Sequence, residues 1–264
     1  MAVTLVLVQM CMAASPVATQ DLHTQSAAAV LARDFADPDL SYLLLDEEGG
    51  VMAQRWDRPE HDIPVGSLTK PFMAVAYGRT HPSFPQLRCT GKKTCWLPRG
   101  HGTLQVREAI AFSCNSYFHQ LVARAGPRFR PAMENFALHG PGSASPERSL
   151  TAASPLVLAR ASLELTRASH DPVVNSVLQG LALSARKGTA SAVAGELHGA
   201  TALAKTGTAP CTHKKKAPGD GFALVMFPAE HPRAVLLVRL HGKPGFMAAG
   251  LAGRMIARVE ESGR

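Results

Sequence analysis

The sequence predicts an α+β protein in which strands from both ends of the chain form one antiparallel sheet beside a helical lobe. Three features indicate this class: paired apolar runs in residues 40–56, helical spacing in residues 104–125 and 151–190, and strand-like runs after residue 200. Terminal strands separated by helices are typical of a single sheet that packs against helices. We therefore expect one sheet, a mostly helical lobe and no internal repeat or linker.

The first strands are expected as a hairpin in residues 40–56. Two apolar runs there flank the turn-like segment Asp46-Glu47-Glu48-Gly49-Gly50, and glycines accept the backbone angles of tight turns. Pro64-Val65-Gly66 then interrupts the chain, and residues 72–77 read as a buried helix. Pro71 falls in the first turn of that helix, where a missing N–H is tolerated.

Helices and then strands are expected in the rest of the chain. Residues 104–125 read as a helix that is interrupted or flanked by Ser113-Cys114-Asn115, and residues 151–190 have helical spacing. The pattern then changes to strand-like runs with a turn at Gly219-Asp220-Gly221. The expected strands are residues 200–209, 221–227 and 234–240, followed by a helix at residues 246–261.

The composition describes a globular chain with an excess of basic residues. Of its 264 residues, 46% are hydrophobic and 18% are charged, which favours one sizeable core over disorder. The formal charge of +8 would suit an anionic environment. Because the Lys and Arg residues are scattered and no nucleic-acid motif accompanies them, we expect no nucleic-acid partner. General surface solvation and a peripheral place at a membrane or cell wall are the two explanations left for the charge.

The N-terminus has the length of an export signal. Residues 1–14 are nearly all apolar and are followed by Ser15-Pro16 and a polar stretch, which suits the apolar core of a signal peptide and is too short to span a bilayer. The positively charged start of such a signal is missing, as it would be if the true start lay upstream. We predict a signal peptide at residues 1–20, a catalytic domain at residues 21–264, and an extracytoplasmic or periplasmic location.

Three short motifs follow one another in a fixed order. They are Ser67-Leu68-Thr69-Lys70, Ser113-Cys114-Asn115 and Lys205-Thr206-Gly207. A serine three residues before a lysine is weak evidence alone, and Ser184-Ala185-Arg186-Lys187 is a second copy to which we give no catalytic meaning. The order of the three motifs is what makes the set typical of acyl-serine enzymes that handle penicillin.

The first motif suits nucleophilic catalysis. A serine hydroxyl is a weak nucleophile at neutral pH and needs a neighbouring base. Ser67 and Lys70 are three residues apart at a helix start, so their side chains share a face. Burial beside other cations lowers the pKa of a lysine and frees its amine as a base. Unpaired N–H groups at the helix start can also face a developing oxyanion.

Four longer stretches resemble the transpeptidase domains of penicillin-binding proteins and the related serine β-lactamases. They are GSLTKPF (66–72), HGTLQVREAIAFSCNSYFHQL (101–121), KGTA (187–190) and ALAKTGTA (202–209). The resemblance covers most of residues 40–260 and implies a β-lactamase/transpeptidase-like fold. It also implies a D,D-transpeptidase or D,D-carboxypeptidase that acts on peptidoglycan stem peptides, binds β-lactams through Ser67, and uses no cofactor or metal.

The resemblance assigns roles to Ser67, Ser113 and Asn115 of the first two motifs. The backbone amides of Ser67 and Thr208 would form an oxyanion hole, worth about 3–4 kcal/mol per donor. Ser113 would relay a proton to the leaving amine. Asn115 would hold both Lys70 and the amide of the substrate.

The third motif would bind the carboxylate of the substrate. By the same resemblance, Lys205 lies on a strand edge and fixes that carboxylate together with Thr206 and Thr208. Gly207 lets the substrate approach the backbone closely. These residues complete the expected site.

The spacing of the motifs departs from that of large penicillin-binding proteins. Ser113 follows Ser67 by 46 residues, and Lys205 follows Ser113 by 92, which is short for a transpeptidase and predicts a reduced all-helical lobe. Two other functions therefore stay open. One is a serine β-lactamase, for which Glu147 comes nearest to a deacylating base. The other is a non-catalytic β-lactam sensor or a degenerate partner in wall assembly.

The cysteines suggest a local disulfide. Cys89 and Cys95 are separated by five residues of a turn-like polar stretch, and a bond between them would suit an exported protein. A zinc site is disfavoured, because this pair needs two more ligands and His101 alone does not supply them. Cys114 and Cys211 are interpreted as small buried thiols rather than as a pair.

Overall fold

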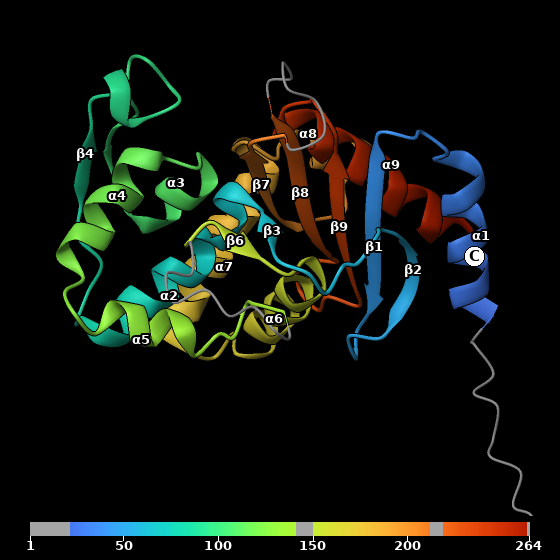
Figure 1. The fold of residues 1–264 in the computed structure, drawn as a ribbon, viewed down its shortest axis with the longest axis horizontal. Helices are drawn as coiled ribbons and strands as arrows, with labels where there is room; N and C mark the ends of the chain where they lie inside the picture. Colours follow the sequence, from blue (N-terminus) through green and yellow to red (C-terminus); the bar gives the residue numbers. More distant parts are fainter. Residues whose placement is uncertain (1–21, 141–149, 212–218, 263–264) are drawn as a thin grey trace, which may run out of the picture.

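The computed structural model describes residues 22–140, 150–211 and 219–262. The predicted signal peptide at residues 1–20 and Glu147 lie outside these ranges. Figure 1 shows a sheet with helices on both faces and, at one end, a lobe made mostly of helices. The predicted α+β class is confirmed.

One five-stranded antiparallel sheet, in the order β2-β1-β9-β8-β7, forms the centre of the molecule. The N-terminal hairpin β1–β2 adds to the C-terminal strands through β1 and β9, where Leu43 lies opposite Leu237. The sheet is therefore built from both ends of the chain, as predicted. The strands are β1 Leu40–Asp46, β2 Val51–Arg55, β7 Leu203–Ala209, β8 Asp220–Phe227 and β9 Ala234–Leu240. Asp220, expected in a turn, is the first residue of β8, one residue before the predicted start of this strand.

Alternate residues of the strands feed two separate cores, as the two-residue period of a strand requires. On β1, Leu43 and Leu45 pack toward the helical lobe, whereas Tyr42 and Leu44 pack against the outer helices. All four side chains are buried. Both faces of the sheet are thus covered, which explains why its strands are almost continuously apolar.

Three helices cover the outer face of the sheet (Figure 1). They are α1 Leu22–Asp34, α8 Ala192–Glu196 and α9 Gly245–Ser262. The sequence predicted α9 but not α1. An ion pair between Arg258 of α9 and Asp34 of α1, at 2.8 Å, joins the two ends of the described chain. Within the described ranges, no helix combines the length and apolarity needed to cross a membrane.

The second lobe is formed by six helices and several short elements. The helices are α2 Lys70–Thr80, α3 Val106–Ala111, α4 Asn115–Arg124, α5 Phe129–Glu134, α6 Pro155–Arg167 and α7 Pro172–Lys187. The short elements are β3 Ile63–Pro64 with β6 Ala152–Ala153, β4 Leu87–Cys89 with β5 Gly102–Leu104, and the 3₁₀ turns η1 Gly66–Thr69 and η2 Lys92–Thr94. The helical stretch at residues 151–190 is divided because Asp171 caps a new helix, accepting a hydrogen bond from the Val173 N–H at 2.8 Å.

Candidate active site

The first two sequence motifs and Thr208, which directly follows the third, line one cleft of about 560 Å³. Ser67 comes from η1, Lys70 from the start of α2, Asn115 from the start of α4, and Thr208 from β7. The wall between them is mostly apolar and includes Met73, Phe118, Val122, Ala123, Leu150, Ala209 and Pro210. A cleft of this size and mostly apolar lining suits a small molecule with an apolar portion.

Two glycines let the first and third motifs touch through their backbones. Gly66 has a φ of +58°, and a Cβ added to it would lie 2.2 Å from the carbonyl oxygen of Thr208. A Cβ on Gly207 would lie 2.6 Å from the carbonyl oxygen of Val65. Only residues without a side chain fit at both positions. This contact sets the Ser67 turn directly beside the edge strand of the sheet.

The second motif occupies the turn between α3 and α4. Ser113 has a φ of +51°, a conformation that is uncommon for a residue with a side chain and is often found at functional sites. The Cys114 sulfur then caps α4 by accepting a hydrogen bond from the Tyr117 N–H at 3.4 Å. The predicted helical interruption is confirmed, and it brings the Ser113 and Asn115 side chains to Lys70.

Lys70 is buried and bonded to the second motif. Its Nζ donates to the Ser113 carbonyl oxygen at 2.9 Å and to Asn115 Oδ1 at 2.5 Å, and it lies 3.4 Å from Ser113 Oγ. The ring of Phe118 lies beneath the same nitrogen, 5.4 Å away. Burial lowers the pKa of the Lys70 amine to about 8, so a neutral amine is accessible near physiological pH.

Lys205 is also bonded to Ser113. Its Nζ donates to Ser113 Oγ at 2.8 Å and to the Thr206 carbonyl oxygen at 2.8 Å. Burial, and next the charge of Lys70, hold the pKa of Lys205 well below its usual value. The hydroxyl of Ser113 is therefore within hydrogen-bond distance of two buried lysines.

Lys205 is less accessible than the sequence suggested. Its exposed fraction is 0%, so its ammonium does not reach the cleft as a substrate ligand would. Thr206 is also buried, and its hydroxyl donates to Thr189 Oγ1 at 2.6 Å. Of the three residues expected to bind a carboxylate, Thr208 is the one that lines the cleft. The strand turns the Lys205 side chain inward, toward Ser113.

Solved structures of penicillin-binding proteins share this fold. The chain is similar to Pseudomonas aeruginosa PBP2, solved in complex with WCK 5153, with 17% identity, a TM-score of 0.71, and coverage of 92% of this chain and 74% of that one. It is similar to the transpeptidase domain of FtsI4 D,D-transpeptidase from Legionella pneumophila, with 18% identity, a TM-score of 0.64, and coverage of 92% and 97%. For PBPA from Mycobacterium tuberculosis, the identity is 16%, the TM-score 0.67, and the coverage 91% and 81%.

The chain has the penicillin-binding transpeptidase fold. This confirms the resemblance found in the motifs. No family model matches the chain, and no curated protein matches it in sequence. The likeness therefore rests on three-dimensional structure, and at these identities it concerns the fold alone.

Within this transpeptidase fold, the structure adds a cleft residue that sequence reasoning missed. His119 is exposed and lines the cleft one helical turn after Asn115. The spacing of four residues places both side chains on the same face of α4. The spacing of Asn115 and His119 is visible in the sequence. It did not indicate a cleft residue, because a single histidine on a helix is common outside functional sites.

The cysteines of this transpeptidase fold are not arranged as the sequence suggested. Cys89 and Cys95 are free thiols and do not form the expected disulfide. Each sulfur lies instead beside His101 Nδ1, at 3.6 Å for Cys89 and 3.5 Å for Cys95. Cys114 is fully buried, as expected, but its sulfur belongs to the same group, 3.9 Å from the Cys95 sulfur. Proximity in sequence thus predicted a Cys89–Cys95 disulfide where the structure has two free thiols beside His101.

Proposed function

We propose that this protein is a penicillin-binding acyl-serine enzyme, a D,D-transpeptidase or D,D-carboxypeptidase that acts on peptidoglycan stem peptides. One observation carries the proposal. Two buried lysines converge on the Ser113 hydroxyl, and one of them, Lys70, lines the same cleft as Ser67. A nucleophile, a base of lowered pKa and a proton relay are the parts that acyl transfer requires.

The hydrogen bonds of Lys70 suit a general base. A neutral amine has two N–H groups and one lone pair. The Ser113 carbonyl oxygen and Asn115 Oδ1 can only accept, so they occupy both N–H groups. The lone pair is then left for the Ser67 hydroxyl proton when the serine oxygen attacks the substrate carbonyl carbon.

The remaining steps follow from the other two motifs. When the tetrahedral intermediate collapses, its C–N bond breaks and the leaving amine needs a proton. Ser113 supplies that proton from its hydroxyl and regains one from Lys70, the group protonated in the first step. The backbone amides of Ser67 and Thr208 are proposed to hold the oxyanion, because the glycine contact sets the two segments side by side.

The substrate carboxylate is proposed to bind at Thr208. Its hydroxyl lines the cleft and accepts a hydrogen bond from the Gly245 N–H at 3.3 Å, which leaves the hydroxyl proton free to donate. The anionic partner also fits the net charge of +8.

A serine β-lactamase is the less favoured function. Rapid loss of the acyl group requires a base aimed at water. Among the described residues that line the cleft, none is Asp or Glu, and Glu147 lies outside the described ranges. We therefore propose slow deacylation. An extracytoplasmic location, as expected for an enzyme of the cell wall, forms part of the same proposal.

Labelling with a fluorescent penicillin tests the proposed function. The wild-type protein is expected to acquire one covalent label that persists after excess drug is removed. Ser67→Ala is expected to lower the labelling rate by at least about 10³-fold, because the nucleophile is gone. Ser184→Ala is the matched control, since Ser184 belongs to the second Ser-x-x-Lys copy and is buried in α7; it is expected to label like the wild type.

The time course separates the alternatives. Rapid loss of label with release of hydrolysed drug would indicate a β-lactamase. Labelling that survives in Ser67→Ala, or an absence of labelling in the wild type, would overturn the acyl-serine proposal. Incubation with a stem pentapeptide, with and without an amine acceptor, then distinguishes carboxypeptidase from transpeptidase products by mass.

A further inference from the structure

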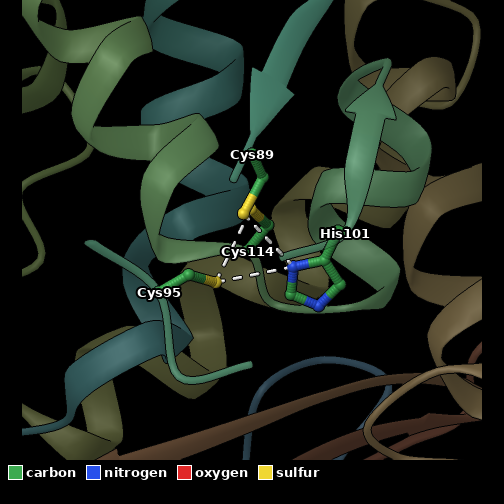
Figure 2. A group of neighbouring side chains, drawn as sticks. All are labelled: Cys89, Cys95, His101 and Cys114. Carbon is green, nitrogen blue, oxygen red and sulfur yellow. Dashed lines mark hydrogen bonds between the residues drawn. The ribbon is translucent and has the colours of Figure 1, made fainter. Parts of the chain in front are cut away.

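Three thiols and one imidazole gather between the β4–β5 connection and the turn that carries the second motif. Figure 2 shows Cys89, Cys95, Cys114 and His101 with their sulfur and nitrogen atoms turned toward one another. The four ligand atoms all lie within 4.8 Å of each other. All three cysteines are buried, and none forms a disulfide.

Three distances within this group are close to those of a tetrahedral metal site. Zinc binds sulfur at about 2.3 Å and nitrogen at about 2.0–2.1 Å, so tetrahedral ligands lie about 3.8 Å apart for two sulfurs and about 3.6 Å apart for sulfur and nitrogen. Here the sulfurs of Cys95 and Cys114 are 3.9 Å apart. His101 Nδ1 is 3.6 Å from the Cys89 sulfur and 3.5 Å from the Cys95 sulfur.

The fold brings these ligands from four places in the chain. Cys89 ends β4, Cys95 follows η2, His101 precedes β5, and Cys114 lies in the turn between α3 and α4. Aromatic rings flank the imidazole, with the Trp96 and Phe112 ring centroids at 5.3 and 6.0 Å. The rings hold His101 with its Nδ1 toward the sulfurs.

The connection between β4 and β5 is a short loop whose hydrogen bonds include Trp96 Nε1–H to the Phe112 carbonyl oxygen at 3.1 Å and Thr94 Oγ1 to the Gly91 carbonyl oxygen at 2.9 Å. Lys93, Thr94, Trp96 and Arg99 are exposed, whereas Cys95 points inward. Gly91 and Gly100 pack so closely that a Cβ on Gly91 would lie 2.4 Å from the Gly100 nitrogen. A small, tightly folded loop with a mainly solvated surface is the setting in which structural zinc sites replace a hydrophobic core.

We propose that Cys89, Cys95, His101 and Cys114 bind one structural zinc ion as a Cys₃His site. The thiols lose their three protons to solvent on binding, and His101 binds through Nδ1. Three sulfurs and one nitrogen in a tetrahedron favour zinc over the oxygen-seeking cations calcium and magnesium. A disulfide would use only two of the three thiols and leave the third buried beside it.

The site also has a consequence for the second motif. Cys114 lies between Ser113 and Asn115 and caps α4. A metal on its sulfur fixes the backbone at this turn, where Ser113 has its unusual positive φ. The zinc would act as a structural anchor that joins the β4–β5 loop to the turn of the second motif.

Metal analysis of the whole protein tests this inference. The protein, purified with a reductant and without chelator, is expected to contain about one zinc per chain. Cobalt added to the stripped protein is expected to give thiolate-to-cobalt absorption and the d–d bands of a tetrahedral ion. Cys95→Ser and His101→Ala are expected to bind zinc at least about 10-fold more weakly. Cys211→Ser is the matched control and is expected to keep both the zinc and the cobalt spectrum.

Several outcomes would overturn the site. They are a zinc dissociation constant weaker than about 1 µM in the reduced wild type, an octahedral cobalt spectrum, or a disulfide among these cysteines in protein isolated from its own compartment. Should the two variants fail to fold, the wild-type cobalt spectrum and zinc affinity decide alone. Ser67→Ala is expected to bind zinc like the wild type, so a failure of penicillin labelling leaves this test intact.

Discussion

At the scale of single residues, the most unusual feature is a pair of lysines buried around one serine hydroxyl. Lys70 and Lys205 are 6% and 0% exposed. Burial of a cation is costly unless it is hydrogen-bonded, and both ammonium groups have oxygen partners from the second or third motif. The free-energy cost of burying these two lysines falls at the candidate active site, where a lysine with a lowered pKa can act as a base.

The rate of acylation is expected to rise with pH through about 8. The pKa of Lys70 is lowered to about 8 by burial, so the neutral amine is scarce below that pH and predominates above it. Acylation by a β-lactam measured between pH 6 and 10 should therefore increase and then level off. A rate that stays constant over this range would exclude Lys70 as the base.

The same shift affects stability in a defined direction. The folded-state pKa of about 8 lies below the ordinary lysine value of 10.5. Between these two values the unfolded chain binds more protons than the folded one, so this group makes the protein more stable as pH rises across that window. Lys70→Met is expected to reduce this pH dependence, as measured by urea unfolding at pH 8 and pH 10.

At the scale of elements, the contact between η1 and β7 decides whether the motifs meet. Both segments could be predicted separately, because local patterns determine them. Apolar runs predicted the strands, and Pro71 and the apolar run after it predicted α2. Their contact could not be predicted, since it depends on the close packing of backbones that are about 140 residues apart.

Gly66→Ala is expected to destabilise the protein much more than Gly126→Ala. Both glycines have positive φ, at +58° and +66°, but a Cβ on Gly66 would meet the Thr208 carbonyl oxygen at 2.2 Å whereas a Cβ on Gly126 would meet nothing within 4 Å. The control should lose about 1–2 kcal/mol from backbone strain alone. Gly66→Ala should lose at least about 3 kcal/mol, because the strand must also move. Urea unfolding measures both, and equal losses would contradict the proposed contact.

Other elements show where local patterns were insufficient. Helix α1 was not predicted from its Ala-rich sequence, and it is held mainly by packing against α9 and the sheet. Asp220 looked like part of a turn because it lies between two glycines. Asp220 is in fact buried, with its carboxylate paired with Arg239 on the neighbouring strand. Tertiary contacts overrode local preference in both cases.

At the scale of the whole molecule, one core runs through both lobes. The inner face of the sheet, with Leu43 and Phe222, belongs to the same hydrophobic cluster as Phe72 of α2 and Leu121 of α4. Although the outer face of the sheet has a second cluster beneath α1, α8 and α9, this shared core joins the two lobes. We expect them to unfold together.

The two tryptophans make this expectation measurable. Trp56 is buried beside the sheet, and Trp96 lies in the β4–β5 loop with 54% exposure. Trp96→Phe leaves Trp56 as the fluorescent reporter, and Trp56→Phe leaves Trp96. In each variant, the midpoint of urea unfolding measured by fluorescence should equal the midpoint measured by circular dichroism. An earlier fluorescence transition in Trp56→Phe, where Trp96 is the reporter, would show that the β4–β5 loop unfolds independently.

The sequence by itself determined the class of the fold, the assembly of its sheet from both ends of the chain, and the residues that carry the proposed chemistry. Those features depend on patterns of two to four residues, which a chain displays without being folded. Only the tertiary structure decided that Lys205 points inward to Ser113, and that Cys89 and Cys95 join one group with His101 and Cys114 and form no disulfide. The physical reason is that these contacts join residues up to 92 positions apart. Close packing, which no local pattern encodes, selects them.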